Sequence, residues 1–486
     1  MRELLAFSPE IVITLAGVGV ILFDALWPGQ GRVERWITLG AMALAAACAV
    51  YVAMNPGLYD VYFSGSLRVD ATTTFARLVF MAAGMLIVLS SWATQGEGDT
   101  AEYYGLLLLS LLGESVIVTA QSLLLLFIGI ELLALPCYAL MAIRKHLPGA
   151  VRAALKYFLL GMFASIVMLY GVAILFGSLR TIGYANGLFP AAGVLDATRN
   201  SVAMLGFLFL FVGIGFKVTA FPFHFWSPDV YATGSTPIVA YVATVPKVAV
   251  MLALWRILGP GFGAAYPVGG MFIAIIAVAS MIYGNIVALL QDDVRRMLAY
   301  SGVANTGYML IAFVAGGAAS GTALAFFLVV YVFGNLGAFL VVMALGVDRK
   351  VSMRDFSGLG ARNGLVAAAM ALCLFSLAGT PPLAGFFGKF ALFKAAVDSG
   401  YAWLALVALI TTVISVGYYL KIATQMYGGI VTPAVAMADE GEGDDKAMLL
   451  TPSARFTVAP ALTAAILVCA AAAVFLGVFG VGLLTG

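Results

Sequence analysis

Charged side chains are scarce in this sequence, and their scarcity excludes a water-soluble fold. Only 10% of the 486 residues are Asp, Glu, Lys or Arg, whereas 63% are hydrophobic and the mean hydropathy is +1.06. A soluble domain of this size could not cover so much apolar surface. We therefore expect an all-α polytopic membrane protein embedded in the lipid bilayer. The net charge of +2 gives no indication of a nucleic-acid partner.

Histidine and cysteine, which supply most transition-metal ligands, are also few. The chain has two histidines, and its four cysteines lie in apolar runs without CxxC or Cys/His spacing. Zinc, haem and iron–sulfur ligation are therefore not expected, and the cysteines fit small buried apolar residues better. The first apolar run, 11–27, lacks a basic leader and a small-residue cleavage site, so no cleavable signal is predicted. The cysteines are Cys48, Cys137, Cys373 and Cys469.

Long apolar runs, by contrast, recur along the whole chain. A helix needs about 20 apolar residues to cross the hydrocarbon core of a bilayer. Two such runs are interrupted, 201–226 by Phe221-Pro222 and 364–396 by the segment 379–382, because proline cannot continue the helical hydrogen-bond ladder. About fourteen spans are predicted, at residues 9–27, 37–54, 72–93, 103–120, 122–142, 153–177, 201–226, 237–258, 267–290, 297–315, 321–346, 364–396, 401–427 and 457–484.

The two breaks lie about 160 residues apart, near 219 and 380. Paired interrupted helices in corresponding positions are typical of transporters built from internal repeats. We therefore predict two five-helix repeats, which have opposite membrane topology because five is an odd number. The predicted division is 1–102 for helices 1 to 3, 103–258 for the first repeat, 267–427 for the second repeat, and 428–486 for a loop and the last helix.

The distribution of basic residues predicts the orientation in the membrane. Loops after odd-numbered spans carry 13 Lys and Arg residues, whereas the N-terminus and the loops after even-numbered spans carry 5. Because cytoplasmic loops are enriched in Lys and Arg, we expect odd-numbered loops in the cytoplasm and both termini on the outer, periplasmic side. The longest predicted cytoplasmic loop, 428–456, contains an acidic run at 439–445 that is expected to be solvated.

Basic residues also occur inside the predicted spans. An ionised side chain at the centre of a membrane helix costs about 2.5–3.5 kcal/mol on insertion scales, so each one requires an explanation. Lys247 lies at mid-span, and Lys217 and Lys389 lie beside the breaks, so a functional role is predicted for these three. Lys156 lies about one turn into its span, where either a role or snorkelling to the interface fits. Those that can snorkel are Arg77, Lys394 and Lys421.

Two glutamates also lie well inside apolar runs. Glu131 is central in its span, and the simplest arrangement pairs it with a membrane lysine. Glu114 matches no motif and is expected to be a neutral acid hydrogen-bonded to a neighbouring helix. Buried lysines together with Glu131 suggest a proton relay, because a change in Glu–Lys separation changes the proton affinity of both groups. His224, beside the first break, either passes protons between Lys217 and water or only satisfies backbone carbonyls.

Four stretches of sequence carry a family resemblance. They are FPFHFWSPDVYATGSTPIVAYVATVPKVAV at 221–250, IELLALP around Glu131, QDDVRRMLAYSGVANTGYM at 291–309 and TPPLAGFFGKF at 380–390. With these motifs, most of the chain from about 103 to 427 resembles the antiporter-like membrane subunits of respiratory complex I. The FHFWSPDVY form with VPK downstream is most similar to the N-chain family of bacterial proton-translocating NADH:quinone oxidoreductase. Lys389 supports this assignment, because the M-chain family has a glutamate there.

The resemblance implies fourteen spans, two inverted five-helix repeats with broken seventh and twelfth helices, and an antiporter-like proton path. It implies that NADH, FMN, iron–sulfur clusters and quinone bind to partner subunits, and this chain itself shows no Rossmann or flavin motif. Expected partners are other complex I membrane subunits, including neighbouring antiporter-like and small membrane chains, in a bacterial inner (plasma) membrane. The residues that match the family's proton path are Glu131, Lys156, Lys217, His224, Lys247, Tyr300 and Lys389.

One segment departs from the family pattern. Residues 303–305 read VAN, where the family usually has Ser and His in the tenth span. Without that histidine, the link from Lys247 to Lys389 would have to use Asn305, Tyr300 or water.

Two other functions remain compatible with these residues. One is a subunit of a related cation/proton antiporter, which would have no electron-transfer partner. The other is a structural membrane scaffold whose lysines only pair internally. Co-purification with flavin and iron–sulfur subunits would separate the antiporter subunit from a complex I subunit, and proton pumping by lysine variants would separate a relay from a scaffold.

Overall fold

Helices make up most of the described part of the protein, whose structure is a computed structural model. It describes residues 2–94, 100–144, 148–184, 187–189, 197–259, 261–346, 350–428, 457–480 and 482. Within these residues, thirteen helical stretches are long and apolar enough to cross a membrane. The broken helix formed by α17 (Gly364–Ala378) and α18 (Ala384–Asp398) adds a further pass. The prediction of an all-α membrane protein with about fourteen spans is therefore confirmed.

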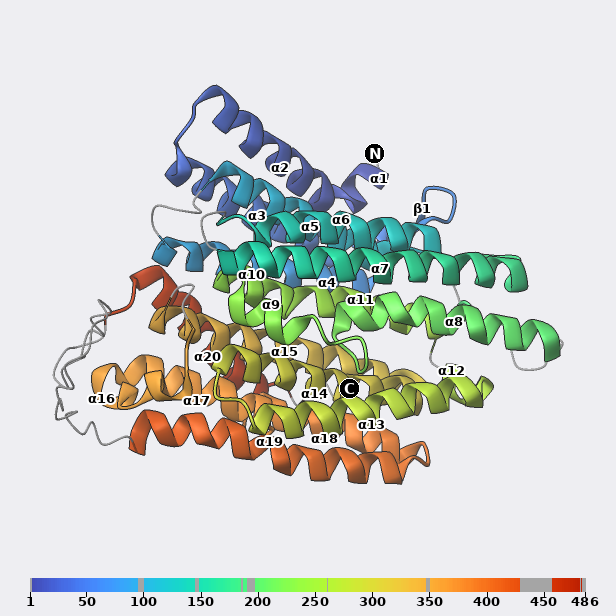
Figure 1. Cartoon of the computed structure of the whole chain (residues 1–486). Helices are drawn as coiled ribbons and strands as arrows, with labels where there is room; N and C mark the ends of the chain where they lie inside the picture. Colours follow the sequence, from blue (N-terminus) through green and yellow to red (C-terminus); the bar gives the residue numbers. More distant parts are fainter. Residues whose placement is uncertain are drawn as a thin grey trace.

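The first three helices lie at the top of Figure 1, and the fourth lies deeper in the molecule, against the central helices. The side chain of Asp70 starts α4 by accepting a hydrogen bond from Thr73 N at 2.9 Å, which satisfies one of the free donors at the helix N-terminus. A short antiparallel hairpin, which was not predicted, precedes this cap and pairs Asp60 with Val69. The elements of this part are α1 (Arg2–Ala6), α2 (Ser8–Leu26), α3 (Gly31–Met54), η1 (Pro56–Leu58), β1 (Asp60–Tyr62), β2 (Leu67–Val69), α4 (Ala71–Ser90) and η2 (Ser91–Thr94).

The remaining helices form the rest of the bundle but are not stacked in chain order, because α15 packs against both α10 and α14, and α20 packs against α15 and α4. In Figure 1 they run side by side from α5 and α6, through α7 and α8, to α19 at the bottom. The first group is α5 (Ala101–Thr119), α6 (Leu123–Met141), α7 (Pro148–Leu179), α8 (Ala197–Val218), α9 (Ser227–Thr233), α10 (Thr236–Val242) and α11 (Val245–Leu258). The second group is α12 (Phe262–Ala265), α13 (Pro267–Leu289), α14 (Val294–Ala315), α15 (Gly317–Leu345), η3 (Met353–Phe356), α16 (Leu359–Arg362), α17, α18, α19 (Ala402–Gly428) and α20 (Pro460–Val478).

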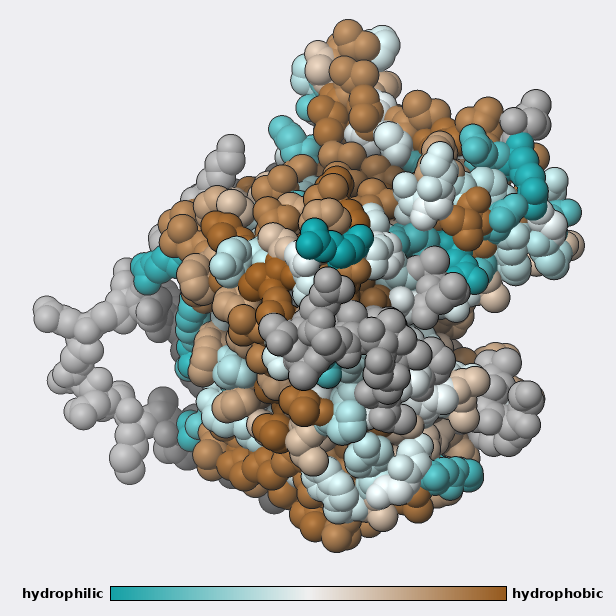
Figure 2. Space-filling view, turned by 90° about the vertical axis from the view of Figure 1, so that its right-hand side faces the viewer, coloured by the Kyte–Doolittle hydropathy of each residue, from teal (hydrophilic) through white to brown (hydrophobic). Residues whose placement is uncertain are grey.

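The most buried helices lie at the centre and the least buried ones at the margin. The apolar windows of α10–α11 and α14 are 94% buried, compared with 28% for α2 and α3. On α7, the side chains of Leu159, Phe163 and Ile166 are 62, 67 and 63% exposed, as expected of residues that face lipid tails. Figure 2 views the bundle from the right-hand end of Figure 1, and hydrophobic residues gather at the rim with hydrophilic residues between them.

Three interruptions divide the central helices. The predicted span 201–226 ends as a helix at Val218, and residues 219–226 separate α8 from α9. The second predicted break separates α17 from α18. The predicted span 237–258 is confirmed as one apolar stretch, Thr236–Leu258, but an interruption that was not predicted lies within it, at Ala243 and Thr244 between α10 and α11. Pro246 stands in the first turn of α11, where its missing N–H needs no partner, so it starts the second segment without disrupting it.

The carbonyls that the first break leaves without helical partners are satisfied by side chains. Trp226 Nε1 donates to Phe216 O at 3.0 Å, and Thr306 Oγ1 donates to Val218 O at 2.6 Å. Buried backbone groups need such partners in place of water. The interruption is therefore a built part of the packing between α8 and α14.

Several predictions are left untested by this structure. The acidic run 439–445 lies outside the described residues. The orientation of the termini, the boundaries of the two repeats and the inverted relation between them remain predictions.

Replacement of Gly385 by alanine is expected to disturb the second break. An added Cβ at Gly385 would lie 1.6 Å from Ser376 O, so α17 and α18 would have to move apart. Overpacking of this kind costs about 1–3 kcal/mol. We expect G385A to lower the midpoint of heat denaturation of the purified membrane protein. The control is G40A within α3, where nothing lies within 4 Å of the added Cβ, and equal midpoints for the two variants would contradict the expectation.

Candidate functional site

Three buried lysines stand beside the interruptions of the central helices. Lys217 is the penultimate residue of α8, Lys247 lies in the first turn of α11, and Lys389 lies in the second turn of α18. Their exposed fractions are 4, 1 and 2%. None of the three ammonium groups has a carboxylate within ion-pair distance in the described part of the chain. We call these three residues the lysine chain.

Lys217 lies among aromatic rings at the first break. Its Nζ donates to Tyr138 OH at 3.5 Å and lies 5.4 Å from the Tyr138 ring centre. The rings of Tyr157 and Phe216 are 5.7 and 5.9 Å away. Aromatic faces attract a cation, so this cage stabilises the ammonium without a formal negative charge.

Glu131, which was predicted to pair with a membrane lysine, is not in direct contact with Lys217. Glu131 Oε1 accepts a hydrogen bond from Ser165 Oγ at 2.5 Å, and the carboxylate interacts with Lys217 only over a longer distance. Tyr138 lies two turns after Glu131 on α6 and supplies the hydroxyl that Lys217 binds. The structure therefore brings the two residues into the same region, with Tyr138 as the group that Lys217 contacts.

Lys247 is held at the centre of the molecule by α14. Its Nζ donates to Gly302 O at 3.0 Å and to Thr306 Oγ1 at 3.3 Å, and it lies 5.1 Å from the Tyr331 ring centre. Thr306 Oγ1 in turn lies 2.6 Å from Val218 O, the residue next to Lys217. The Thr306 hydroxyl thus joins the first break to the central lysine.

Lys389 binds a carbonyl at the C-terminal end of α17, the helix before the second break. Its Nζ donates to Ala378 O at 3.1 Å, which is the last carbonyl of α17 and has no partner within that helix. The ammonium also lies 4.5 Å from the ring centre of Tyr308 on α14. One helix, α14, therefore contacts both Lys247 and Lys389.

A hydrogen-bonded polar cluster extends from Tyr308 and was missed by the sequence analysis. Asn285 Nδ2 donates to Tyr308 OH at 3.1 Å, and Tyr418 OH donates to Asn285 Oδ1 at 3.0 Å. Ser301 and Tyr419 share a hydroxyl–hydroxyl hydrogen bond of 2.5 Å. The available signal was the recurrence of small polar and tyrosine residues in otherwise apolar helices.

Asn305 and Tyr300 were two of the groups predicted to connect Lys247 with Lys389. Asn305 adjoins the Ser301–Tyr419 part of this cluster, whereas Tyr300 lies beside His224. Asn305 Nδ2 donates to Ser301 O at 2.9 Å, which is a bond within α14. The ring of Tyr300 lies 6.3 Å from that of His224. Helix α14 contacts Lys247 through Thr306 and Lys389 through Tyr308, and these are two separate contacts.

His224 is enclosed by aromatic rings next to the first break. Its side chain is buried, and the ring centres of Phe225 and Tyr283 both lie 4.8 Å away. Neither ring nitrogen has a hydrogen-bond partner among the described residues. The structure therefore does not show His224 capping backbone carbonyls, and it does not place His224 in contact with Lys217.

Lys156 lies at the surface, apart from the lysine chain. It pairs with Asp229, and the second oxygen of Asp229 accepts from Arg296 Nη2 at 3.0 Å. These three side chains are between 38 and 47% exposed, so water screens their charges. Asp229 had been quoted only as part of the WSPDVY motif, and it connects α7, α9 and α14.

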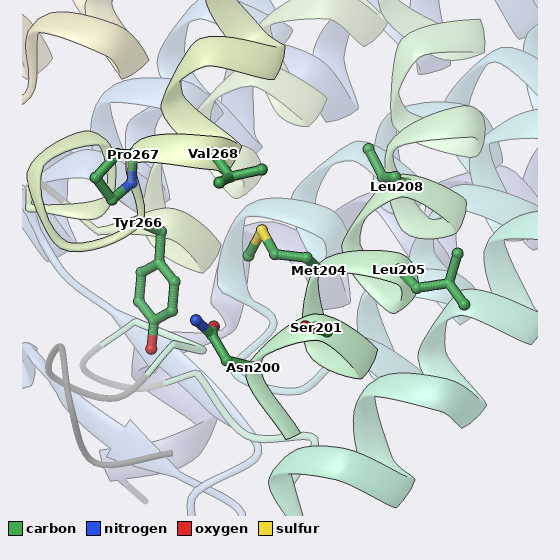
Figure 3. Close-up of a pocket in the computed structure, with 8 residues that line it drawn as sticks. All are labelled: Asn200, Ser201, Met204, Leu205, Leu208, Tyr266, Pro267 and Val268. Atoms are coloured by element: carbon green, nitrogen blue, oxygen red, sulfur yellow. The ribbon is translucent and has the colours of Figure 1, made fainter. Parts of the chain in front are cut away.

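A separate cavity of about 350 Å³ lies between α8 and the start of α13. Figure 3 shows Asn200 and the Tyr266 hydroxyl at one side and the apolar side chains of Met204 and Leu208 at the other. None of its lining residues belongs to the lysine chain. In the described residues no group of three or more His, Cys, Asp or Glu side chains could hold a metal ion.

A family model described as "NADH:quinone oxidoreductase/Mrp antiporter, TM" matches residues 120–415. The match covers more than half of the chain and includes every predicted proton-path residue. Fold and site together thus define an antiporter-like membrane subunit.

Relatives that match over most of their length show which family of antiporter-like subunits the chain belongs to. NADH-quinone oxidoreductase subunit N of Desulfovibrio desulfuricans is 36% identical over 500 residues, covering 100% of this chain and 96% of the relative. The subunit N of Rhodobacter capsulatus is 34% identical over 426 residues, covering 87% of this chain and 88% of the relative. The chain belongs to the NADH-quinone oxidoreductase subunit N family.

Two solved structures share the fold. A chain of respiratory complex I from Thermus thermophilus, with bound aureothin, superposes with a TM-score of 0.81 at 29% identity, covering 98% of this chain and 99% of that chain. A chain of the Mrp complex from a Dietzia species superposes with a TM-score of 0.85 at 22% identity, covering 99% and 95%. The second likeness establishes the fold alone.

Removal of the Thr306 hydroxyl is expected to weaken the connection between the first break and Lys247. A hydrogen bond to a charged group contributes about 1.5–3 kcal/mol, and 1.4 kcal/mol corresponds to about a tenfold change in rate. We expect T306V to lower the rate of proton movement by about tenfold, measured in vesicles that contain the purified complex. T322V is the matched control, because the Thr322 hydroxyl donates to Ala318 O within α15 at an exposed position. Equal rates for both variants would contradict a role for Thr306.

Proposed function

We propose that this chain moves protons across the membrane as a subunit of an NADH:quinone oxidoreductase, complex I. Electron transfer from NADH to quinone takes place in other subunits, which hold NADH, FMN, the iron–sulfur clusters and the quinone. The observation that carries the proposal is the buried lysine chain, whose members stand beside helix interruptions. Membership of the subunit N family over the full length of the chain supports the coupling to NADH oxidation.

The partners of the three lysines suit groups that gain and lose protons. Each ammonium binds carbonyl or hydroxyl oxygens and aromatic faces. These neutral partners stabilise a positive charge less than a carboxylate would, so no ion pair holds the proton in place. Permanent pairing of the kind expected of a scaffold is therefore not observed among the described residues.

The three lysines lie near helix ends of different polarity, so they experience different electric fields. Lys217 and Lys389 lie near the C-terminal ends of α8 and α17, where the free carbonyls carry partial negative charge. Lys247 lies in the first turn of α11, at the positive end of that helix. Proton-binding groups with unequal surroundings in series are what a directed relay requires.

The first half of the proposed path contains Glu131, Lys217 and Lys247. A movement of residues 219–226 would change the distance between Glu131 and Lys217, and with it the proton affinity of both groups. His224 and Tyr300 lie beside this break and stay candidates for the connection to water. Lys156 is a candidate for the cytoplasmic end of the path, because its ion pair with Asp229 is exposed.

The second half of the proposed path leads from Lys247 to Lys389 along α14. We place the two repeats at 103–258 and 267–427, in inverted orientation, with both termini on the periplasmic side of a bacterial inner membrane. The proposed partners are neighbouring antiporter-like and small membrane subunits of the same complex.

An alternative function is that of a subunit of a cation/proton antiporter without electron-transfer partners. The superposition on the Mrp complex chain supports only the shared fold, because the sequences are 22% identical. Co-purification distinguishes the two functions, since only a complex I subunit is recovered together with flavin- and iron–sulfur-containing subunits.

Substitution of the lysine chain is expected to impair pumping while the complex still assembles. A positioned acid–base group contributes about 10²–10⁴-fold to a proton-transfer step. We therefore expect K217A or K247A to lower NADH-driven proton pumping several-fold in vesicles, and E131Q to lower the number of protons moved per electron. K394A is the control, because Lys394 is exposed and pairs with Asp398 at the end of α18. Normal pumping by both lysine variants would exclude the relay.

A further inference from the structure

Glu114 is a buried acid that the proposed relay does not use. Its side chain on α5 is completely buried, and neither carboxyl oxygen has a hydrogen-bond partner among the described residues. In place of a well-formed hydrogen bond, the expected partner on a neighbouring helix is the Tyr241 hydroxyl of α10, which interacts with Glu114 more loosely. Burial of a carboxylate without a compensating partner is costly. The buried Glu10, by contrast, has a charged partner, because Arg77 donates two hydrogen bonds to it at 2.7 and 2.9 Å.

The groups around Glu114 link it to the first and third interruptions. The Tyr241 hydroxyl on α10 interacts with Glu114 but stands outside hydrogen-bond geometry. Tyr241 is held by Ser110 of α5, whose Oγ lies 2.7 Å from Tyr241 OH. The thiol of Cys137 on α6 is close enough to interact with both Glu114 and Lys217. Glu114 thus lies in the same neighbourhood as the first member of the lysine chain.

Close packing of α5 against α6 determines where Glu114 sits. A Cβ at Gly113 would lie 2.3 Å from Leu133 N, so the two backbones are in contact immediately before Glu114. Glu114 itself is completely buried in this packed region. Its position next to Tyr241 and Cys137 is a property of the packed core.

We infer that Glu114 is a further proton-carrying residue of the path, which exchanges a proton with the Lys217 end of the lysine chain. The inference rests on the proposed function. In the exchange, an N–H bond of the Lys217 ammonium breaks as an O–H bond forms on Glu114, and two buried charges become two neutral groups. The reverse transfer restores both charges, so no oxidant or reductant takes part. Two neutral groups cost less to bury than two separated charges.

The test compares E114Q and E114D in the intact complex, reconstituted in vesicles. Glutamine keeps the size and polarity of the side chain but cannot carry a proton, whereas aspartate keeps the acid. We expect E114Q to move fewer protons per NADH oxidised and E114D to retain most of the wild-type ratio. E34Q is the matched control, because Glu34 is a buried glutamate in α3, outside both proposed repeats.

A purely structural role predicts the opposite order, with E114Q near the wild-type ratio and E114D impaired, and that order would overturn the inference. If K217A lowers pumping and E114Q does not, the inference fails while the proposed relay stands. If neither variant lowers pumping, the relay itself fails.

Should E114Q not assemble, infrared difference spectra between the resting and turning-over complex provide the second measurement. A carboxylic acid band that shifts in E114D, and not in E34D, supports proton exchange at Glu114. An unchanged band overturns it.

Discussion

The burial of lysine ammonium groups without carboxylate partners is the constraint on which the arrangement of the central helices depends. Such a charge needs oxygen atoms or aromatic faces in a region where intact helices use up their own carbonyls. The second interruption supplies such a carbonyl directly, whereas Lys247 uses Gly302 O of α14 and Lys217 uses the Tyr138 hydroxyl. Ala378 O at the end of α17 binds Lys389, and Val218 O at the end of α8 binds the Thr306 hydroxyl that also contacts Lys247. The broken helices and the buried lysines therefore depend on each other, because groups at the helix ends help to stabilise the buried ammonium groups.

The uninterrupted helix α14 holds the two broken regions together. It contacts Lys247 through Gly302 and Thr306, and its Tyr308 ring lies beneath Lys389. At the surface, Arg296 of the same helix shares Asp229 with Lys156. A displacement of α14 would change the surroundings of two lysines and an ion-pair cluster together. Such a shared element is a physical route by which the two halves of the path could respond to one another.

Much of the fold was predictable because its determinants are local. Apolar runs of about 20 residues, proline at 222 and at 381–382, and basic residues far from any interface are visible in the sequence without knowledge of the packing. The interruption before Lys247 was missed, since Pro246 is compatible with a helix start and the break lies at Ala243 and Thr244. Some residues of the proposed path were predicted, because a lysine inside a membrane span by itself indicates a functional site.

The sequence by itself determined the membrane class, the positions of two breaks and the identity of three buried lysines, all of which follow from residue chemistry and short-range pattern. Only the tertiary structure determined which groups these buried side chains contact. It separated Glu131 from Lys217, enclosed His224 in aromatic rings, and left Glu114 without a hydrogen bond. The reason is that these contacts join residues far apart in the chain, such as Tyr418 and Asn285, and depend on how helices pack. Helix packing in lipid rests on close backbone approach and side-chain fit, which no local pattern encodes.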